Sequence, residues 1–139
     1  MNIVVAYNGS EPAKRALELA KTHAKAFDAV VTILISMYGD VDQDSSPSKI
    51  ESFWTDVIKA EKELAKLREN FEKESIKCST HVMARGGDPG EDILDFADQV
   101  GADEIIIGIE KKSKVGKLLF GSTAQKVILE AKCPVITVS

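Results

Sequence analysis

One run near the start of the chain, Asn2-Ile-Val-Val-Ala-Tyr-Asn-Gly-Ser-Glu-Pro12, determines which fold class the sequence can adopt. Its first half is apolar and β-branched, which is typical of a buried strand. The Asn-Gly pair by itself would also suit a hairpin turn. Apolar residues then recur at helical spacing from Ala13 to Phe27, with Ser10 placed as an N-cap and Pro12 in the first turn. The run therefore predicts a strand-to-helix turn.

The rest of the chain repeats this alternation of strand and helix. Further strands are expected at Ala29–Met37, Lys77–Ala84, Glu104–Gly108 and Pro134–Val138, and further helices across Ile50–Phe71, from Pro89 to Gly101 and at Ser122–Ala131. A coiled coil is the alternative for the longest helix, but the next strand follows too closely for several more heptads. Right-handed crossovers predict an α/β fold with a parallel sheet covered on both faces. Ligands of such sheets bind beyond the carboxyl ends of the strands.

Composition limits the classes of protein to consider. The 139 residues suit a single domain spanning 1–139, and 44% hydrophobic with 29% charged residues is typical of a soluble globule. No apolar run is long enough to cross a membrane, and no basic leader precedes one, so we expect no membrane partner. The net charge of -4 disfavours nucleic acid as a partner. Cys78 and Cys133 are expected as reduced thiols in a cytoplasmic protein, with one disulfide as the alternative.

The loop after the fourth strand carries most of the chemical information. Its segment 109–117 holds four lysines and one glutamate, a local charge of +3 in an acidic chain. The loop ends at Gly121-Ser122-Thr123, where a helix is expected to begin, and helix N-termini attract anions. Glycine lets a phosphate approach the backbone, and the hydroxyls can donate hydrogen bonds to it. A polyphosphate site is one interpretation; a capping box between Ser122 and Gln125 beside a solvated lysine-rich surface is the other.

The same loop resembles a family motif. Its register, Gly108-x2-Lys111-x9-Gly121-Ser122, is similar to the Gly-x2-Gly-x9-Gly-(Ser/Thr) pattern of the nucleotide-binding branch of the universal stress protein family. Asn8-Gly9-Ser10 resembles the Asp-Gly-Ser of the family's first loop, and residues 121–138 resemble its last helix and strand. The resemblance covers essentially the whole chain, in order and in length.

The resemblance implies a Rossmann-like, doubly wound, five-stranded parallel sheet of order 3-2-1-4-5. It further implies ATP or a related adenine nucleotide as a regulatory ligand in a stress response, with Mg²⁺ as a companion ion that the sequence neither requires nor excludes. The residues that it places around adenine, ribose and phosphates are Ala6, Tyr7, Asn8, Ser10, Met37, Ile107, Gly108, Glu110, Lys111, Gly121, Ser122 and Thr123. No catalytic residue is implied, although slow ATP hydrolysis stays open, and members commonly form homodimers through the last strand, here Pro134–Val138.

Two departures from the motif keep other functions open. Asn8 replaces an anionic acceptor with an amide, and Lys111 places a side chain where the family has glycine. A dimeric interaction module of the same fold that binds no nucleotide is the alternative function. An enzyme acting on adenylates is a third, but Tyr7–Glu11 lacks the Ser-Gly-Gly-x-Asp-Ser type of loop that related enzymes need.

Other motifs are given structural interpretations, and no metal site is predicted. Asp40, Asp42, Asp44 and Glu51 mimic a calcium loop, but Ser45 occupies the position that needs glycine. The two histidines, His23 and His81, have no ligand partner at metal-binding spacing. Asp88 and Glu91 are expected to cap a helix, Arg85-Gly86-Gly87 to form a turn, and Trp54 to lie in the core or an interface.

Overall fold

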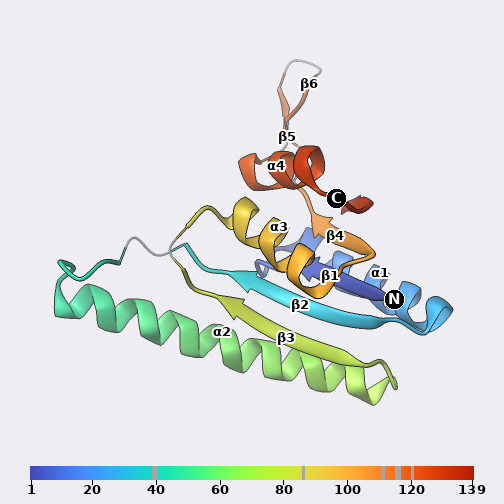
Figure 1. The fold of residues 1–139 in the computed structure, drawn as a ribbon, viewed down its shortest axis with the longest axis horizontal. Coiled ribbons are helices and arrows are strands. Elements are labelled where there is room, and N and C mark those ends of the chain that lie inside the picture. Colours follow the sequence, from blue (N-terminus) through green and yellow to red (C-terminus); the bar gives the residue numbers. More distant parts are fainter. Residues whose placement is uncertain (39–40, 86, 111, 115–116, 120) are drawn as a thin grey trace.

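The computed structural model describes residues 1–38, 41–85, 87–110, 112–114, 117–119 and 121–139. Strands and helices alternate along the chain (Figure 1). In order they are β1 (Asn2–Ala6), α1 (Glu11–Phe27), β2 (Val30–Ser36), α2 (Pro47–Lys73), β3 (Cys78–Met83), α3 (Pro89–Val100), β4 (Glu104–Gly108), β5 (Lys112–Lys114), β6 (Lys117–Leu119), α4 (Ser122–Glu130) and β7 (Val135–Val138).

Five parallel strands form the main sheet in the order β3-β2-β1-β4-β7. This confirms the predicted α/β class and the strand order 3-2-1-4-5. The order reverses at β1, which lies between β2 and β4 and ends first: its last residue, Ala6, pairs with Leu34 on one side and Ile107 on the other. Since β2 continues to Ser36 and β4 to Gly108, a gap opens between them where β1 ends.

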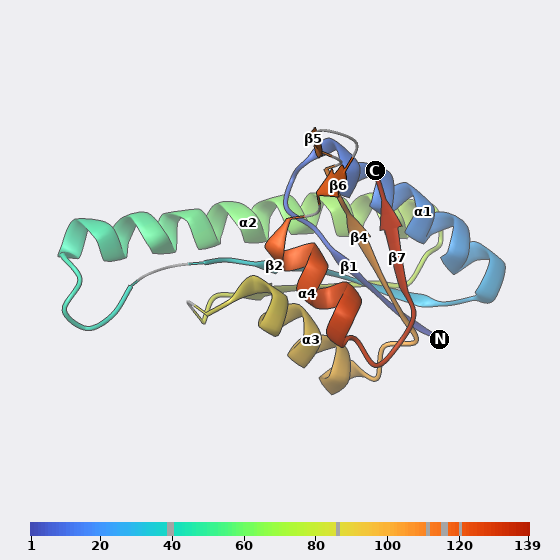
Figure 2. The same ribbon diagram turned by 90° about the horizontal axis from the view of Figure 1, so that it is seen from above.

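Helices cover both faces of the sheet, α1 and α2 on one and α3 and α4 on the other (Figure 2). Successive strand residues alternate between the two layers, as the period of a strand requires. In β1, Ile3 and Val5 pack with α1 and α2, whereas Val4 and Ala6 pack with α3 and α4. Nearly continuous apolar strands are therefore buried on both faces.

The starts of α1 and α3 agree with the N-caps expected from the sequence. Ser10 caps α1, its Oγ accepting from the backbone N–H of Ala13 at 3.2 Å. Asp88 caps α3, its carboxylate accepting from the N–H of Gly90 at 2.9 Å, and Gly101 ends that helix with a φ of +62°. Such side chains satisfy N–H groups that have no partner within the helix.

Two features differ from expectation. The lysine-rich segment expected as a loop contains a two-stranded antiparallel ribbon, β5–β6. Of the two placements expected for Trp54, the core is wrong, because its side chain is 54% exposed, and the interface stays a prediction. Ile58 is also half exposed, whereas Val57, Leu64 and Phe71 on α2 are buried. Val57, Leu64 and Phe71 follow one another at intervals of seven and form the buried line of α2, whereas Trp54 and Ile58 lie to one side of it. The first turns of α2 also extend past the carboxyl end of the sheet (Figures 1 and 2).

Cys78 is buried and Cys133 half-buried, and both are free thiols. Burial raises the pKa of the Cys78 thiol to about 11. Within the described residues, no helix combines the length and the apolar character that a membrane crossing needs.

Candidate functional site

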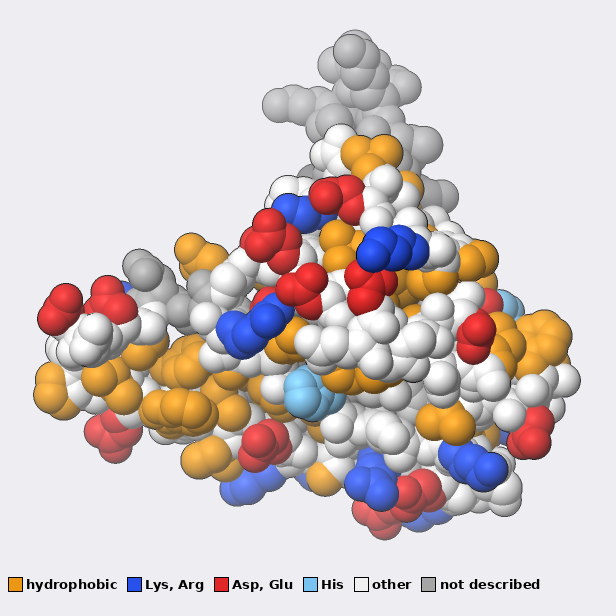
Figure 3. Space-filling view, in the orientation of Figure 1, with side chains coloured by type: hydrophobic (Ala, Val, Ile, Leu, Met, Phe, Trp, Pro, Cys, Tyr) orange, Lys and Arg blue, Asp and Glu red, His pale blue; other side chains and the backbone are white. Residues whose placement is uncertain are grey.

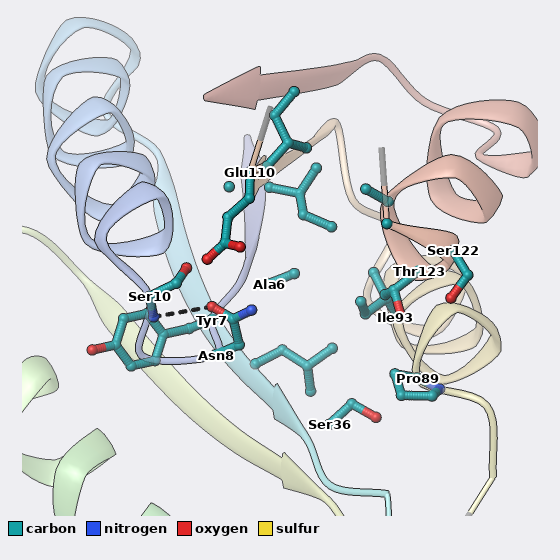
Figure 4. A pocket seen from close by; sticks show the side chains of 16 residues that line it. Ala6, Tyr7, Asn8, Ser10, Ser36, Pro89, Ile93, Glu110, Ser122 and Thr123 are labelled. Atoms are coloured by element: carbon teal, nitrogen blue, oxygen red, sulfur yellow. Dashed lines mark hydrogen bonds between the residues drawn. The ribbon is translucent and has the colours of Figure 1, made fainter. Parts of the chain in front are cut away.

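A cavity of about 530 Å³ lies at the carboxyl ends of the strands, in the gap that β1 leaves between β2 and β4. Its walls come from the first turns of α3 and α4, from the loop after β1 and from the segment after β4 (Figure 4). This volume is within the range of small-molecule sites, and the position is the switch point at which such sheets bind ligands.

Ten of the twelve predicted site residues line this cavity, although they lie far apart in the sequence. They are Ala6, Tyr7, Asn8, Ser10, Ile107, Gly108, Glu110, Gly121, Ser122 and Thr123. Met37 lies instead in a neighbouring recess of about 370 Å³ that shares Tyr7, Asn8 and Ser36 with the cavity. Lys111 falls outside the described residues.

Six further residues, which the sequence did not indicate, also line the cavity. They are Leu34, Ser36, Pro89, Ile93, Ile109 and Ala124. A signal for two of them was available. Leu34 and Ser36 are two positions apart at the end of β2 and so share a face. Met37 has the opposite parity and is directed to the other layer of the molecule. The α3 residues gave no local signal, since only the packing of α3 brings Pro89 and Ile93 to the sheet.

The loop after β1 presents defined polar groups to the cavity. The amide oxygen of Asn8 accepts from the backbone N–H of Ser10 at 3.1 Å, so its amino group is turned toward the cavity (Figure 4). Tyr7 is 4% exposed, and its hydroxyl donates to Glu63 of α2 at 2.9 Å. Burial, together with that carboxylate, raises the pKa of Tyr7 to about 12, so the phenol stays neutral.

The two motif glycines, Gly108 and Gly121, have different roles. A Cβ atom at Gly108 would lie 2.5 Å from the backbone N of Ala13, so glycine is required there for α1 to pack against β4. At Gly121 φ is -62°, and among the described residues nothing lies within 4 Å of the position that a Cβ atom would take. Neither backbone conformation nor packing in that part of the chain requires glycine at 121, although glycine is a favoured N-cap, and the open space leaves the backbone there accessible.

The N-terminus of α4 forms one end of the cavity. Gly121 is the N-cap and makes no side-chain cap hydrogen bond. Ser122 is thus the first helical residue, and the expected capping box between Ser122 and Gln125 is wrong. The hydroxyls of Ser122 and Thr123 lie on the cavity wall beside the first backbone N–H groups of the helix (Figure 4). Donors of this kind, at the positive end of the helix dipole, suit an anion.

Acidic groups are sparse around the cavity. Glu110 is the one carboxylate among the described lining residues, and its side chain is directed inward toward Asn8 and Ser10 (Figure 4). Across the part of the chain that the structure describes, no three His, Cys, Asp or Glu side chains are grouped to hold a metal ion. Of the calcium-like loop, Asp40 lies outside the described residues and Glu51 lies within α2.

The remaining motif residues have structural partners. His23 Nδ1 lies 2.6 Å from Oε1 of Glu104, and the His81 ring stacks on Phe96 with centroids 4.9 Å apart. Glu91 does not complete a capping box; its carboxylate accepts from Lys126 of α4 at 3.0 Å. The negative carboxylates of α3 thereby bind α4 and support the wall of the cavity (Figure 3 shows this acidic and basic face).

Comparison with known proteins agrees with the fold. The chain matches the universal stress protein family over residues 1–139. The chain belongs to this family. It is 34% identical to a universal stress protein of Thermus aquaticus over 136 residues, covering 98% of this chain and 96% of the relative. The structure of this chain is also similar to two solved structures of universal stress proteins from Archaeoglobus fulgidus.

One of these is a universal stress protein with 36% identity and a TM-score of 0.77, covering all of this chain and 93% of the other. The second is the universal stress protein in complex with dAMP, with 34% identity and a TM-score of 0.75, covering all of this chain and 98% of the other. This chain therefore shares its fold with relatives that it matches over nearly their whole length.

Proposed function

We propose that this universal stress protein binds ATP or a related adenine nucleotide in the cavity as a regulatory ligand of a stress response. The observation that carries the proposal is the convergence at Gly121: a glycine with open space around it, at a helix N-terminus, facing a cavity at the switch point of the sheet. The relative from Archaeoglobus fulgidus that was solved with dAMP supports an adenine nucleotide as the ligand class.

The distribution of polar and apolar groups in the cavity supports one orientation of the bound nucleotide. Phosphates fit the α4 end, where backbone N–H groups and the hydroxyls of Ser122 and Thr123 can donate to them. Ribose hydroxyls fit the carboxylate of Glu110, which can only accept. The apolar side chains Leu34, Ile93 and Ile107 form the floor on which a base can lie.

A binding function, and not an enzymatic one, suits the groups at hand. Among the described lining residues, no histidine or cysteine is present, and Tyr7 is held neutral by its raised pKa. General base catalysis of hydrolysis would depend on Glu110, which is exposed and has no second acid nearby in the described lining. Any hydrolysis of ATP is therefore expected to be slow. The free thiols are consistent with action in the cytoplasm.

Equilibrium dialysis with radiolabelled ATP tests the proposal. Purified protein is expected to retain ATP with saturable binding below millimolar nucleotide, and mass spectrometry of gently purified protein should detect a bound adenine nucleotide. The Gly121→Ala variant, whose methyl group would occupy the approach to the helix N-terminus, is measured beside the wild type and is expected to bind ATP more weakly. No binding by the wild-type protein at millimolar ATP would contradict the proposed function.

We also propose a homodimer formed through β7. In the described sheet β7 pairs with β4 on one side only, and its apolar residues are half-buried, so its other edge is available to a second copy. Sedimentation should show a dimer, and Thr137→Pro, which removes an N–H from the edge of β7 that faces away from β4, should shift the protein toward monomer. A wild-type protein that sediments as a monomer at all concentrations would rule this interface out.

A further inference from the structure

Ser36 lies at the carboxyl end of β2 and lines both the cavity and the neighbouring recess. Its side chain extends toward Pro89 and the start of α3 (Figure 4). The hydroxyl lies 2.8 Å from Oδ2 of Asp92 on α3. The lining of the cavity thus contains a hydroxyl group whose orientation is determined by a residue behind it.

Asp92 is held by a second partner. It is 2% exposed, and its other oxygen, Oδ1, accepts from Nε and Nη2 of Arg85 at 3.2 and 2.9 Å. The same guanidinium also binds Asp95 at 3.0 Å. A guanidinium is always protonated, and its two donors stabilise the charged form of the buried carboxylate. Asp92 is therefore an ionised, acceptor-only group.

The direction of the hydrogen bond follows from this charge state. An ionised carboxylate has no hydrogen to give, so Ser36 must donate to Asp92. A hydroxyl has a single hydrogen, and that hydrogen is used. Toward the cavity Ser36 Oγ can present only lone pairs, which attract a donor such as an amino group and repel an acceptor such as a carbonyl or phosphate oxygen.

We propose that Ser36, oriented by Asp92, is a specificity residue that selects a purine with an amino group over one with a carbonyl oxygen at the same ring position. The inference rests on the proposed function, in which phosphates occupy the α4 end and leave the Ser36 end to the base. Adenine carries an amino group at C6, whereas hypoxanthine and guanine carry an oxygen there. Arg85 is a positioning residue that acts through Asp92.

The test compares dissociation constants of ATP and ITP, which differ at C6, by calorimetry on three proteins. The wild type is expected to bind ATP about tenfold more tightly than ITP, the effect of one favourable hydrogen bond replaced by a repulsive contact. In Ser36→Ala this ratio should fall toward one, mainly through weaker ATP binding. Ser79→Ala is the matched control, because Ser79 is exposed on β3 away from the cavity and should keep the wild-type ratio.

A second variant reverses the hydrogen bond. In Asp92→Asn the amide oxygen can still accept from Arg85 while its amino group donates to Ser36, which frees the serine hydrogen to point into the cavity. The preference should then shift toward ITP. Circular dichroism reports whether each variant is folded. The ratio of the ATP and ITP dissociation constants of the wild type tests the proposal even if a variant does not fold.

The outcomes separate the two proposals. A wild-type protein that binds neither nucleotide overturns the proposed function, and this assignment with it. Two other results overturn the role of Ser36 alone. One is equal affinity of the wild type for ATP and ITP. The other is a preference for ATP that stays unchanged in both Ser36→Ala and Asp92→Asn when these variants are folded.

Discussion

A methyl group on Gly108 would lie 2.5 Å from the backbone N of Ala13, well inside any tolerated contact. The end of β4 and the first turn of α1 meet there without space for a side chain. We therefore predict that Gly108→Ala destabilises the fold by about 1–3 kcal/mol, as overpacking does. Chemical denaturation measures this loss.

Gly121→Ala provides the contrasting case. Because its φ is -62° and the described surroundings are open, stability should change by less than about 0.5 kcal/mol. ATP affinity, in contrast, should fall about tenfold or more as the methyl group obstructs the phosphates. Unchanged affinity in this variant would show that the phosphates do not lie at the N-terminus of α4.

Ser122 and Ser10 offer a second contrast, between a ligand-facing hydroxyl and a capping one. Ser122→Ala should weaken nucleotide binding and leave the thermal midpoint nearly unchanged, since the hydroxyl caps nothing. Ser10→Ala removes the N-cap of α1 and should cost about 1 kcal/mol of stability. Thermal denaturation with and without ATP measures both effects. A large stability loss in Ser122→Ala would contradict this division of roles.

Glu74 is expected to contribute to the loss of stability at acidic pH. Hydrogen bonds from Lys21 first, and from Lys25, lower the pKa of Glu74 to about 2. A depressed pKa stabilises the fold above the unfolded value near 4.5, and this contribution is lost as the pH falls toward 2. The free energy of unfolding of Glu74→Gln should thus decline less between pH 5 and pH 3 than that of the wild type. Parallel curves, measured by urea denaturation, would assign the acid limb to other groups.

Trp54 tests the exposed start of α2. With its side chain 54% exposed, Trp54→Ala should change stability by less than about 0.5 kcal/mol, whereas truncation of buried Leu64 should cost about 2–5 kcal/mol. Emission of the single tryptophan is expected at long wavelength and open to quenching by iodide. A short-wavelength, protected emission would indicate that a second molecule covers this face in solution.

Local patterns predict most of the fold because each element carries its own signals. Ser10 and Pro12 start α1, Asp88 and Pro89 start α3, and Gly101 ends it, all through bonds within a few residues. At α4 the sequence pattern places the N-cap one residue too late, on Ser122, because Ser122 with Gln125 three residues on resembles a capping box. Only the backbone dihedrals of Gly121 distinguish the two arrangements.

The site is predicted less completely than the fold. The resemblance places ten residues around one cavity, but it does not reveal Ser36 bound to Asp92, residues 56 positions apart that meet only when α3 packs on the sheet. Nor does periodicity show which part of a broad apolar stripe becomes buried: Trp54 belongs to the same stripe of the sequence as Leu64, but it lies to one side of the buried line formed by Val57, Leu64 and Phe71.

The order of strands and helices, the caps of α1 and α3 and the family follow from the chain alone, since they depend on side-chain periodicity and on contacts between near neighbours. Assembly in three dimensions decides the rest. The gap beyond β1, the different reasons for Gly108 and Gly121, and the direction in which the Ser36 hydroxyl donates all arise from groups brought together by crossovers, and a linear pattern does not record which of them touch.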